Sequence, residues 1–236
     1  MRTQRRDQDS VRVVSTILFG SRARNDQSEF SDTDLLLISL ENDRKHVSSG
    51  NLSLFLYSWE SLREDAENGD LFVCHLAHEA KPLIDPENYL AKLRGRFKFR
   101  TNYNRDIDNA IDLAWFLILQ GDQINDALLA KRALWCVRTV LIAEAANRRE
   151  AIFAPQQLAE QTSSQAGRRI LQSRHEKIGS AFTTKLLEGF MSDIGYRAVP
   201  RSLKSVEDFR RRFVDTSNEV ALQTMNQEVE SRSGYT

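Results

Sequence analysis

Apolar runs that suit buried strands are confined to the first part of the chain. Residues 13–19 are β-branched and apolar and run directly into Gly20. Residues 35–40 and 52–57 are two further apolar runs, long enough for strands and too short for typical helices. The run at 35–40 is almost entirely apolar, which predicts a strand buried on both faces. A short segment at 82–84 predicts an edge strand.

Between the last two of these runs, polar and apolar positions follow a helical period. Ser58 is placed to cap a helix over residues 59–68. Gly69 follows it, where helices commonly end in a left-handed residue. Residues 71–80 predict a second short helix.

Helical spacing dominates the rest of the chain, starting at Pro86, because proline suits the first turn of a helix. An apolar segment at 128–146 predicts a helix at the centre of a bundle, and residues 203–220 predict one final amphipathic helix. The sequence therefore predicts an α+β protein with two domains. A small mixed β-sheet domain covers residues 1–86, and an all-helical bundle covers residues 87–236.

The bulk composition is that of an ordinary soluble globular protein, with 41% hydrophobic and 28% charged residues. Lys plus Arg (33) equals Asp plus Glu (33), so the net charge predicts no polyanion partner. Cys74 and Cys136 lie far apart in apolar stretches and predict reduced thiols. No apolar run reaches the roughly 18 residues of a membrane span, and the N-terminus lacks the apolar core of a signal peptide. We therefore expect a cytoplasmic protein with no membrane partner.

The residues that follow the first predicted strand are of the kinds that bind phosphate. Gly20 permits a tight turn, and Ser21 opens a short helix. Backbone N–H groups and a hydroxyl then converge where phosphate oxygens can bind. Arg22 or Arg24 adds positive charge there.

Two carboxylates follow at the start of the next predicted strand. Strand side chains alternate, so Asp32 and Asp34 point the same way. Beside a phosphate-binding turn, such a pair suits Mg²⁺ bridged to the phosphates. A Gly-Ser turn or an Asp-x-Asp pair that occurs alone more often belongs to a surface loop with capping aspartates. Their combination between two buried strands favours the site.

The stretch Phe19-Gly-Ser-Arg, followed by Ser31-Asp-Thr-Asp34, resembles the G-S-x(8–12)-[ST]-D-x-D motif of the DNA polymerase β-like nucleotidyltransferase superfamily. It is most similar to small bacterial members, the minimal and aminoglycoside nucleotidyltransferases. The match is strong over residues 14–38 and weaker to about residue 85.

The resemblance implies transfer of a nucleoside monophosphate from a nucleoside triphosphate such as ATP to an acceptor hydroxyl. The acceptor is left open as a small molecule, a protein or an RNA end. It also implies two Mg²⁺ ions, with Asp32 and Asp34 as catalytic metal ligands. The residues that would bind the nucleotide are Gly20, Ser21, Arg22 and Ser31.

One element of the family pattern is missing. The third carboxylate normally lies on the third strand, where Ser53 occupies the best-matching position. Glu41, Asp43 and Glu60 are the other acids considered, and none is expected to replace it. We therefore expect a weakened second metal site and weakened turnover. The alternative is a catalytically weakened nucleotide sensor or an antitoxin-like interaction protein.

The helical half resembles the bundles that complete the acceptor site in two-domain members, and it resembles HEPN domains in shape. Arg169 and His175 match the spacing of HEPN ribonucleases, but a chance match is favoured. The group Cys74, His75 and His78 suggests a metal, but a structural role is favoured. Two kinds of protein partner stay open: a second copy in a homodimer, or a toxin–antitoxin type partner.

Overall fold

Strands and helices are segregated along the chain, which divides into two compact units, Met1–Arg100 and Thr101–Thr236. The computed structural model describes residues 12–29, 31–41, 44–174, 176 and 178–233. Helix α4 (Tyr89–Arg96) belongs to the first unit. Among the helices of the described ranges, none has the length and apolar character needed to cross a membrane.

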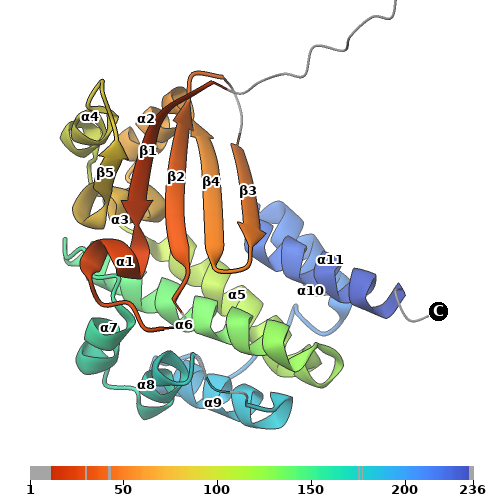
Figure 1. Cartoon of the computed structure of the whole chain (residues 1–236). Helices are drawn as coiled ribbons and strands as arrows, with labels where there is room; N and C mark the ends of the chain where they lie inside the picture. Colours follow the sequence, from red (N-terminus) through yellow and green to blue (C-terminus); the bar gives the residue numbers. More distant parts are fainter. Residues whose placement is uncertain (1–11, 30, 42–43, 175, 177, 234–236) are drawn as a thin grey trace, which may run out of the picture. The chain divides into compact units, whose positions relative to one another are not determined.

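The first unit is built on a five-stranded sheet with the strand order β3-β4-β2-β1-β5 (Figure 1). Strands β2 and β4 pair in parallel, and the other neighbouring strands pair antiparallel. The C-terminal end of β1 therefore lies at the same end of the sheet as the N-terminal ends of β2 and β4. The bounds are β1 Val13–Phe19, β2 Thr33–Ser39, β3 Arg44–Ser49, β4 Leu52–Ser58 and β5 Lys81–Ile84.

Helices α2 (Trp59–Glu67) and α3 (Leu71–Glu79) cover one face of this sheet (Figure 1). The Phe72 ring of α3 lies 5.5 Å from the Phe19 ring and 5.6 Å from the Phe55 ring, measured between centroids. Offset or edge-on aromatic contacts at such separations add to the stabilisation that comes from burial alone. The core of this unit thus reaches the end of β1.

Strand β2 is buried more on one face than on the other. Leu36 and Ile38 have no exposed surface, whereas Leu35 and Leu37 are only half-buried. Strand side chains alternate, and α2 and α3 pack against one face. The prediction that this strand is buried on both faces is therefore only half right.

Strand β3 is absent from the sequence prediction. Its residues are mostly polar and all of them are exposed, as suits an edge strand. It pairs with β4 through a tight turn at Gly50-Asn51, in which Gly50 has a φ of +56°. The Gly-Asn turn signal is visible in the sequence, but the polar strand before it has no hydrophobic pattern.

Local capping sets the bounds of α2 as predicted. The Ser58 hydroxyl accepts a hydrogen bond from the Ser61 N–H at 3.1 Å, and Gly69 follows the helix with a φ of +66°. A Cβ atom at Gly69 would lie 2.4 Å from the Lys98 carbonyl oxygen. Glycine is therefore required both by backbone conformation and by the close approach of another segment.

Helix α4 begins later than expected, at Tyr89, with Pro86 in the preceding turn. The Asp85 carboxylate accepts hydrogen bonds from the backbone N–H groups of Tyr89 and Leu90 at 2.8 and 3.0 Å. The prediction that Pro86 lies in the first turn is wrong, because the Asp85 side chain caps a helix that starts three residues further on.

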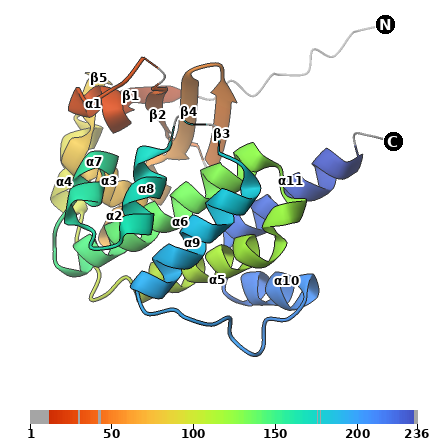
Figure 2. The same ribbon diagram turned by 90° about the horizontal axis from the view of Figure 1, so that it is seen from below.

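Within the described residues, the second unit is helical. Helix α6 contacts α5, α7, α8 and α9, and α5 and α6 lie side by side (Figure 2). The predicted helix over residues 128–146 is thus confirmed as the centre of a bundle, and the α+β fold class is confirmed with it. The bounds are α5 Asn104–Gln120, η1 Gly121–Gln123, α6 Asp126–Asn147, α7 Pro155–Gln161, α8 Gln165–Gln172, α9 Ser180–Asp193, α10 Val206–Asp215 and α11 Glu219–Ser233.

The predicted final helix over residues 203–220 is wrong, because two helices, α10 and α11, replace it. Ser217 has a φ of +53° between them. The Asn218 side chain donates to the Asn109 carbonyl at 2.8 Å and accepts from the Ala221 N–H at 3.3 Å. This side chain begins α11 and fixes it to α5, so a tertiary contact interrupts an otherwise helical pattern.

Candidate active site

The turn after β1 is shaped by Gly20, the first residue of α1 (Gly20–Arg24). Gly20 has a φ of +72°, in the left-handed region that favours glycine. A Cβ atom at this position would lie 2.5 Å from Oδ2 of Asp34. The absence of a side chain therefore lets the Asp34 carboxylate lie against the backbone of the turn.

The sheet register brings three strands together at this point. Asp34 pairs with Phe19 across the antiparallel β1–β2 ladder and with Ser53 across the parallel β2–β4 ladder. Paired residues in neighbouring strands share a face of the sheet. Asp34 is half-buried, and Ser53 is 8% exposed. Ser53 thus lies beside Asp34, and Ser53 is the residue that the motif resemblance matches to the family's third acid.

The other aspartate of the pair, Asp32, lies just before β2 and is exposed. The next residue, Thr33, donates its N–H to the Asn51 carbonyl oxygen at 2.7 Å. This hydrogen bond ties the start of β2 to the β3–β4 turn. Both aspartates therefore lie at the end of the sheet where β1 ends.

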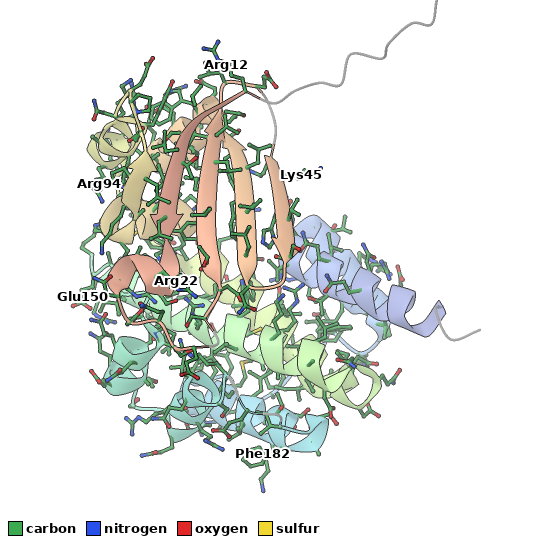
Figure 3. All side chains as sticks on the ribbon, in the orientation of Figure 1. Arg12, Arg22, Lys45, Arg94, Glu150 and Phe182 are labelled. Carbon is green, nitrogen blue, oxygen red and sulfur yellow. The ribbon has the colours of Figure 1, made fainter. Side chains whose placement is uncertain are left out.

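Arg22 and Ser31 come together in the loop that joins α1 to β2. Arg22 Nη2 donates to the Ser31 carbonyl oxygen at 3.1 Å, and the Ser28 N–H donates to Ser31 Oγ at 2.9 Å. Arg22 lies at the end of the sheet where β1 gives way to α1 (Figure 3). Its Nε atom is buried and has no hydrogen-bond partner among the described residues. Ser31 therefore serves the loop structure, while Arg22 keeps one N–H available.

Among the described residues, no third acid joins this pair in a group that could hold a metal ion. Within the described ranges, no group of three or more His, Cys, Asp or Glu side chains is placed to hold a metal ion. Of the acids considered from the sequence, Glu60 pairs with Arg63 on α2. Glu41 is exposed beyond the opposite end of β2. Asp43 lies outside the described residues. Neither Glu41 nor Glu60 therefore supplies the third carboxylate that is missing at Ser53.

Comparison with known families matches residues 2–84 to the family described as "Nucleotidyltransferase domain". The matched region contains the Gly20 turn, both aspartates and the five strands. This region is a nucleotidyltransferase domain of the DNA polymerase β-like superfamily. The superfamily predicted from the motif is thereby confirmed.

Among solved structures, one similar chain is a nucleotidyltransferase-like protein from Exiguobacterium sibiricum 255-15. It has 14% sequence identity and a TM-score of 0.33, and the match covers 77% of this chain and 68% of that chain. A comparison with curated proteins found no match.

A half-buried cluster of charges connects helix α1 of the nucleotidyltransferase domain to α3. Arg24 Nη1 donates to Glu79 Oε2 at 2.6 Å, and His75 Nε2 lies 2.8 Å from the same oxygen. Arg24 Nε also donates to Asp26 at 2.9 Å. The side chains of Arg24, His75 and Glu79 are 12–15% exposed. Arg24 is therefore committed to this cluster, which leaves Arg22 as the arginine that faces the loop.

The charge cluster has consequences for proton binding. Burial alone would raise the pKa of Glu79, but hydrogen bonds and charge attraction from His75 and Arg24 outweigh it and hold that pKa below its ordinary value. Sequence analysis missed this cluster because Glu79 lies 55 residues from Arg24. Only the packing of α1 on α3 brings them together.

The Cys74, His75 and His78 group does not converge on a metal. His75 binds Glu79, whereas His78 Nδ1 lies 2.8 Å from the Cys74 carbonyl oxygen. Burial raises the pKa of the Cys74 thiol to about 12, which keeps it protonated. These side chains have structural roles in α3.

The HEPN-type spacing is only partly visible in the second unit. Arg169 on α8 forms an ion pair with Glu176 at 2.7 Å. His175 lies outside the described residues.

Proposed function

We propose that this protein transfers a nucleoside monophosphate from a nucleoside triphosphate to an acceptor hydroxyl, with Mg²⁺ at Asp32 and Asp34. The nucleotidyltransferase domain supports nucleotidyl transfer in general. The observation that carries the placement is the contact of the Asp34 carboxylate with the Gly20 turn, where a Cβ atom would lie 2.5 Å from Oδ2. This contact supports the proposal, because it brings a carboxylate next to a turn that we propose as the phosphate site.

The donor set suits one Mg²⁺ ion. Two carboxylates, from Asp32 and Asp34, together with phosphate oxygens and water, are the hard oxygen ligands that Mg²⁺ prefers. When bound, Mg²⁺ polarises the α-phosphate and offsets the charge of the leaving pyrophosphate. Ser53 offers a hydroxyl where a third carboxylate would complete a second site. We therefore assign one ion to this chain's own side chains.

The remaining residues bind and orient the triphosphate. Phe19 provides no side-chain cap to α1, so the first N–H groups after Gly20 and the Ser21 hydroxyl can donate to phosphate oxygens. The buried Nε of Arg22, which lacks a partner among the described residues, adds a charged donor. In the transfer, the acceptor oxygen bonds to the α-phosphorus, the bond to the β-phosphate oxygen breaks and pyrophosphate leaves.

Ser53 also supports a second candidate function. Without an acid beside Asp34, a nucleotide can be held without being transferred efficiently. The protein would then act as a nucleotide sensor or an antitoxin-like interaction protein. The helical second unit would supply either the acceptor site or the partner surface.

Two measurements on the same samples test these functions. Calorimetry with ATP, GTP, CTP and UTP in Mg²⁺ measures binding. Pyrophosphate release with a small-molecule, peptide and RNA acceptor series measures transfer. We expect both for the wild type, and at least tenfold weaker nucleotide binding for Asp34→Asn. Glu41→Gln, an exposed acid beyond the other end of β2, is the matched control.

The outcomes separate the candidates. Binding without release across the acceptor series would favour the sensor. Binding that Asp34→Asn leaves unchanged would contradict both functions, because each requires nucleotide and metal at this pair.

A further inference from the structure

The inner face of β3 carries a line of polar side chains that leads away from the third-acid position. Ser48 pairs with Ser53 across the β3–β4 ladder, and their Oγ atoms lie 3.4 Å apart. Ser48 Oγ in turn lies 3.1 Å from Nε2 of His46, two residues earlier on the same face. Two hydroxyl groups thus lie in line from the neighbour of Asp34 to an imidazole, with a separation of 3.4 Å between the two serine oxygens.

His46 is held in place and open to water at the same time. Its ring stacks on Phe55 with a centroid distance of 4.2 Å and an interplanar angle of 18°, yet the residue is exposed. The charged neighbour on its strand face is Arg44, which pairs with Asp65 of α2 and lies over the Tyr57 ring. The imidazole therefore has a fixed orientation and a route for exchanging protons with solvent.

We propose that Ser53, Ser48 and His46 form a proton path that replaces the missing third acid. This inference rests on the proposed transfer reaction. The acceptor hydroxyl gives its proton to Ser53 Oγ as its oxygen bonds to the α-phosphorus and pyrophosphate leaves. Ser53 passes its own proton to Ser48 Oγ, and Ser48 passes its own to His46 Nε2. His46 then releases a proton to water.

The geometry suits a path that closes when substrate is bound. At 3.4 Å the two serine oxygens are further apart than in a formed O–H···O bond. Catalytic hydrogen bonds are often long in a free enzyme and tighten in the substrate complex. The path also requires the neutral His46 tautomer with its proton on Nδ1, so that Nε2 accepts from Ser48.

Measurement of pyrophosphate release tests the path. The assay uses each of the four triphosphates in Mg²⁺, first with water alone and then with the acceptor series. We expect His46→Gln and Ser48→Ala to lower the rate by about 100-fold, the lower end of what general base catalysis contributes. The KM for the triphosphate should change by less than about twofold, because neither residue belongs to the proposed phosphate site. Lys45→Gln and Ser49→Ala, on the opposite face of β3, are matched controls.

The pH profile and the tautomer give independent readouts. The wild-type rate should depend on pH because the path requires a neutral imidazole, and His46→Gln should remove this dependence. Nitrogen NMR should find His46 protonated on Nδ1, and Ser48→Ala should shift the proton toward Nε2. In a Ser53→Asp background, the loss caused by His46→Gln should shrink at least tenfold, because the new acid takes the proton directly.

The results separate failure of the proton path from failure of the proposed transfer reaction. Wild-type release that His46→Gln leaves unchanged, or an equal loss in Lys45→Gln, overturns the proton path alone. Nucleotide binding without any release by the wild type overturns the transfer reaction and the path with it.

Discussion

Ser53 lies directly beside Asp34 in the parallel pairing of β4 with β2, and it is almost fully buried there. Under the proposed function, a hydroxyl therefore occupies the place where a carboxylate would share metal ions with Asp34. Binding of nucleotide and metal by the nucleotidyltransferase domain and transfer of the nucleotide are therefore separate questions for this site. It also makes the site unusually open to a gain-of-function test.

Ser53→Asp should create a metal-dependent stability. Two carboxylates side by side and largely buried repel each other, so we expect a loss of about 1–3 kcal/mol without metal. Mg²⁺ at 100 times its dissociation constant should restore about 2.7 kcal/mol. Thermal unfolding with and without Mg²⁺ measures this. Ser49→Asp, an exposed serine on β3, should show no such rescue. Equal Mg²⁺ responses in the two variants would contradict the proposal that Ser53 lies beside the metal-binding pair Asp32 and Asp34.

Gly20→Ala should damage stability and binding together. The added Cβ atom meets Asp34 Oδ2 at 2.5 Å, and the φ of +72° is unfavourable for alanine. We expect a loss of about 1–3 kcal/mol in urea unfolding and about tenfold weaker triphosphate binding by calorimetry. Gly95→Ala is the control, because a Cβ there meets nothing within 4 Å inside helix α4, and it should be neutral or stabilising. Full binding by Gly20→Ala would argue against a phosphate site at this turn.

Glu79→Gln should expose the pH dependence of the charge cluster on α1 and α3. The folded-state pKa of Glu79 is lowered from its ordinary 4.5, so its contribution is present above that value and lost as pH falls through the folded pKa. We expect the variant to lose about 1–3 kcal/mol at pH 7 and the difference from wild type to shrink below pH 4.5. Urea unfolding across this range measures both. Glu150→Gln, from an exposed ion pair, should cost less than about 1 kcal/mol.

The cost of Arg212→Met should also shrink as pH falls, although the pKa of its partner Asp112 is raised and not lowered. Burial raises the pKa of Asp112 despite its 2.7 Å ion pair with Arg212. A raised folded-state pKa means that Asp112 supports folding below its ordinary value of 3.8 and ceases to do so as pH rises through the folded pKa. Removing Arg212 should cost about 1–3 kcal/mol at pH 7 and less at pH 4, as followed by chemical unfolding. Arg210→Met, whose nearest acid is 4.0 Å away, is the control. A loss independent of pH would indicate lost packing instead.

Cys74 should resist alkylation in the folded protein. Burial raises its thiol pKa to about 12, and burial also raises the pKa of Cys136. Only the thiolate reacts, so iodoacetamide at pH 8 should label neither cysteine in native conditions and both in guanidinium chloride. Mass spectrometry of the peptides follows each site. Fast labelling of Cys74 in the native protein would contradict its burial on the inner side of α3.

Local signals were sufficient for much of the fold. The apolar runs gave β1, β2 and β4, and Ser58 and Gly69 gave the limits of α2, because capping and burial patterns act within a few residues. Strand β3 was missed, because its exposed polar residues form a strand only by pairing with β4. The break before α11 was missed for a related reason, since Asn218 begins that helix while bonded to α5.

The sequence by itself determined the nucleotidyltransferase domain and its Gly20, Asp32 and Asp34 arrangement, because the motif's spacing is local to one turn and two strands. Tertiary structure decided which neighbours those residues have. It set Ser53 beside Asp34, committed Arg24 to Glu79 and brought His46 and Ser48 toward the site. Strand register and helix packing join residues far apart in the chain, and no local pattern encodes the side chain that faces a given carboxylate.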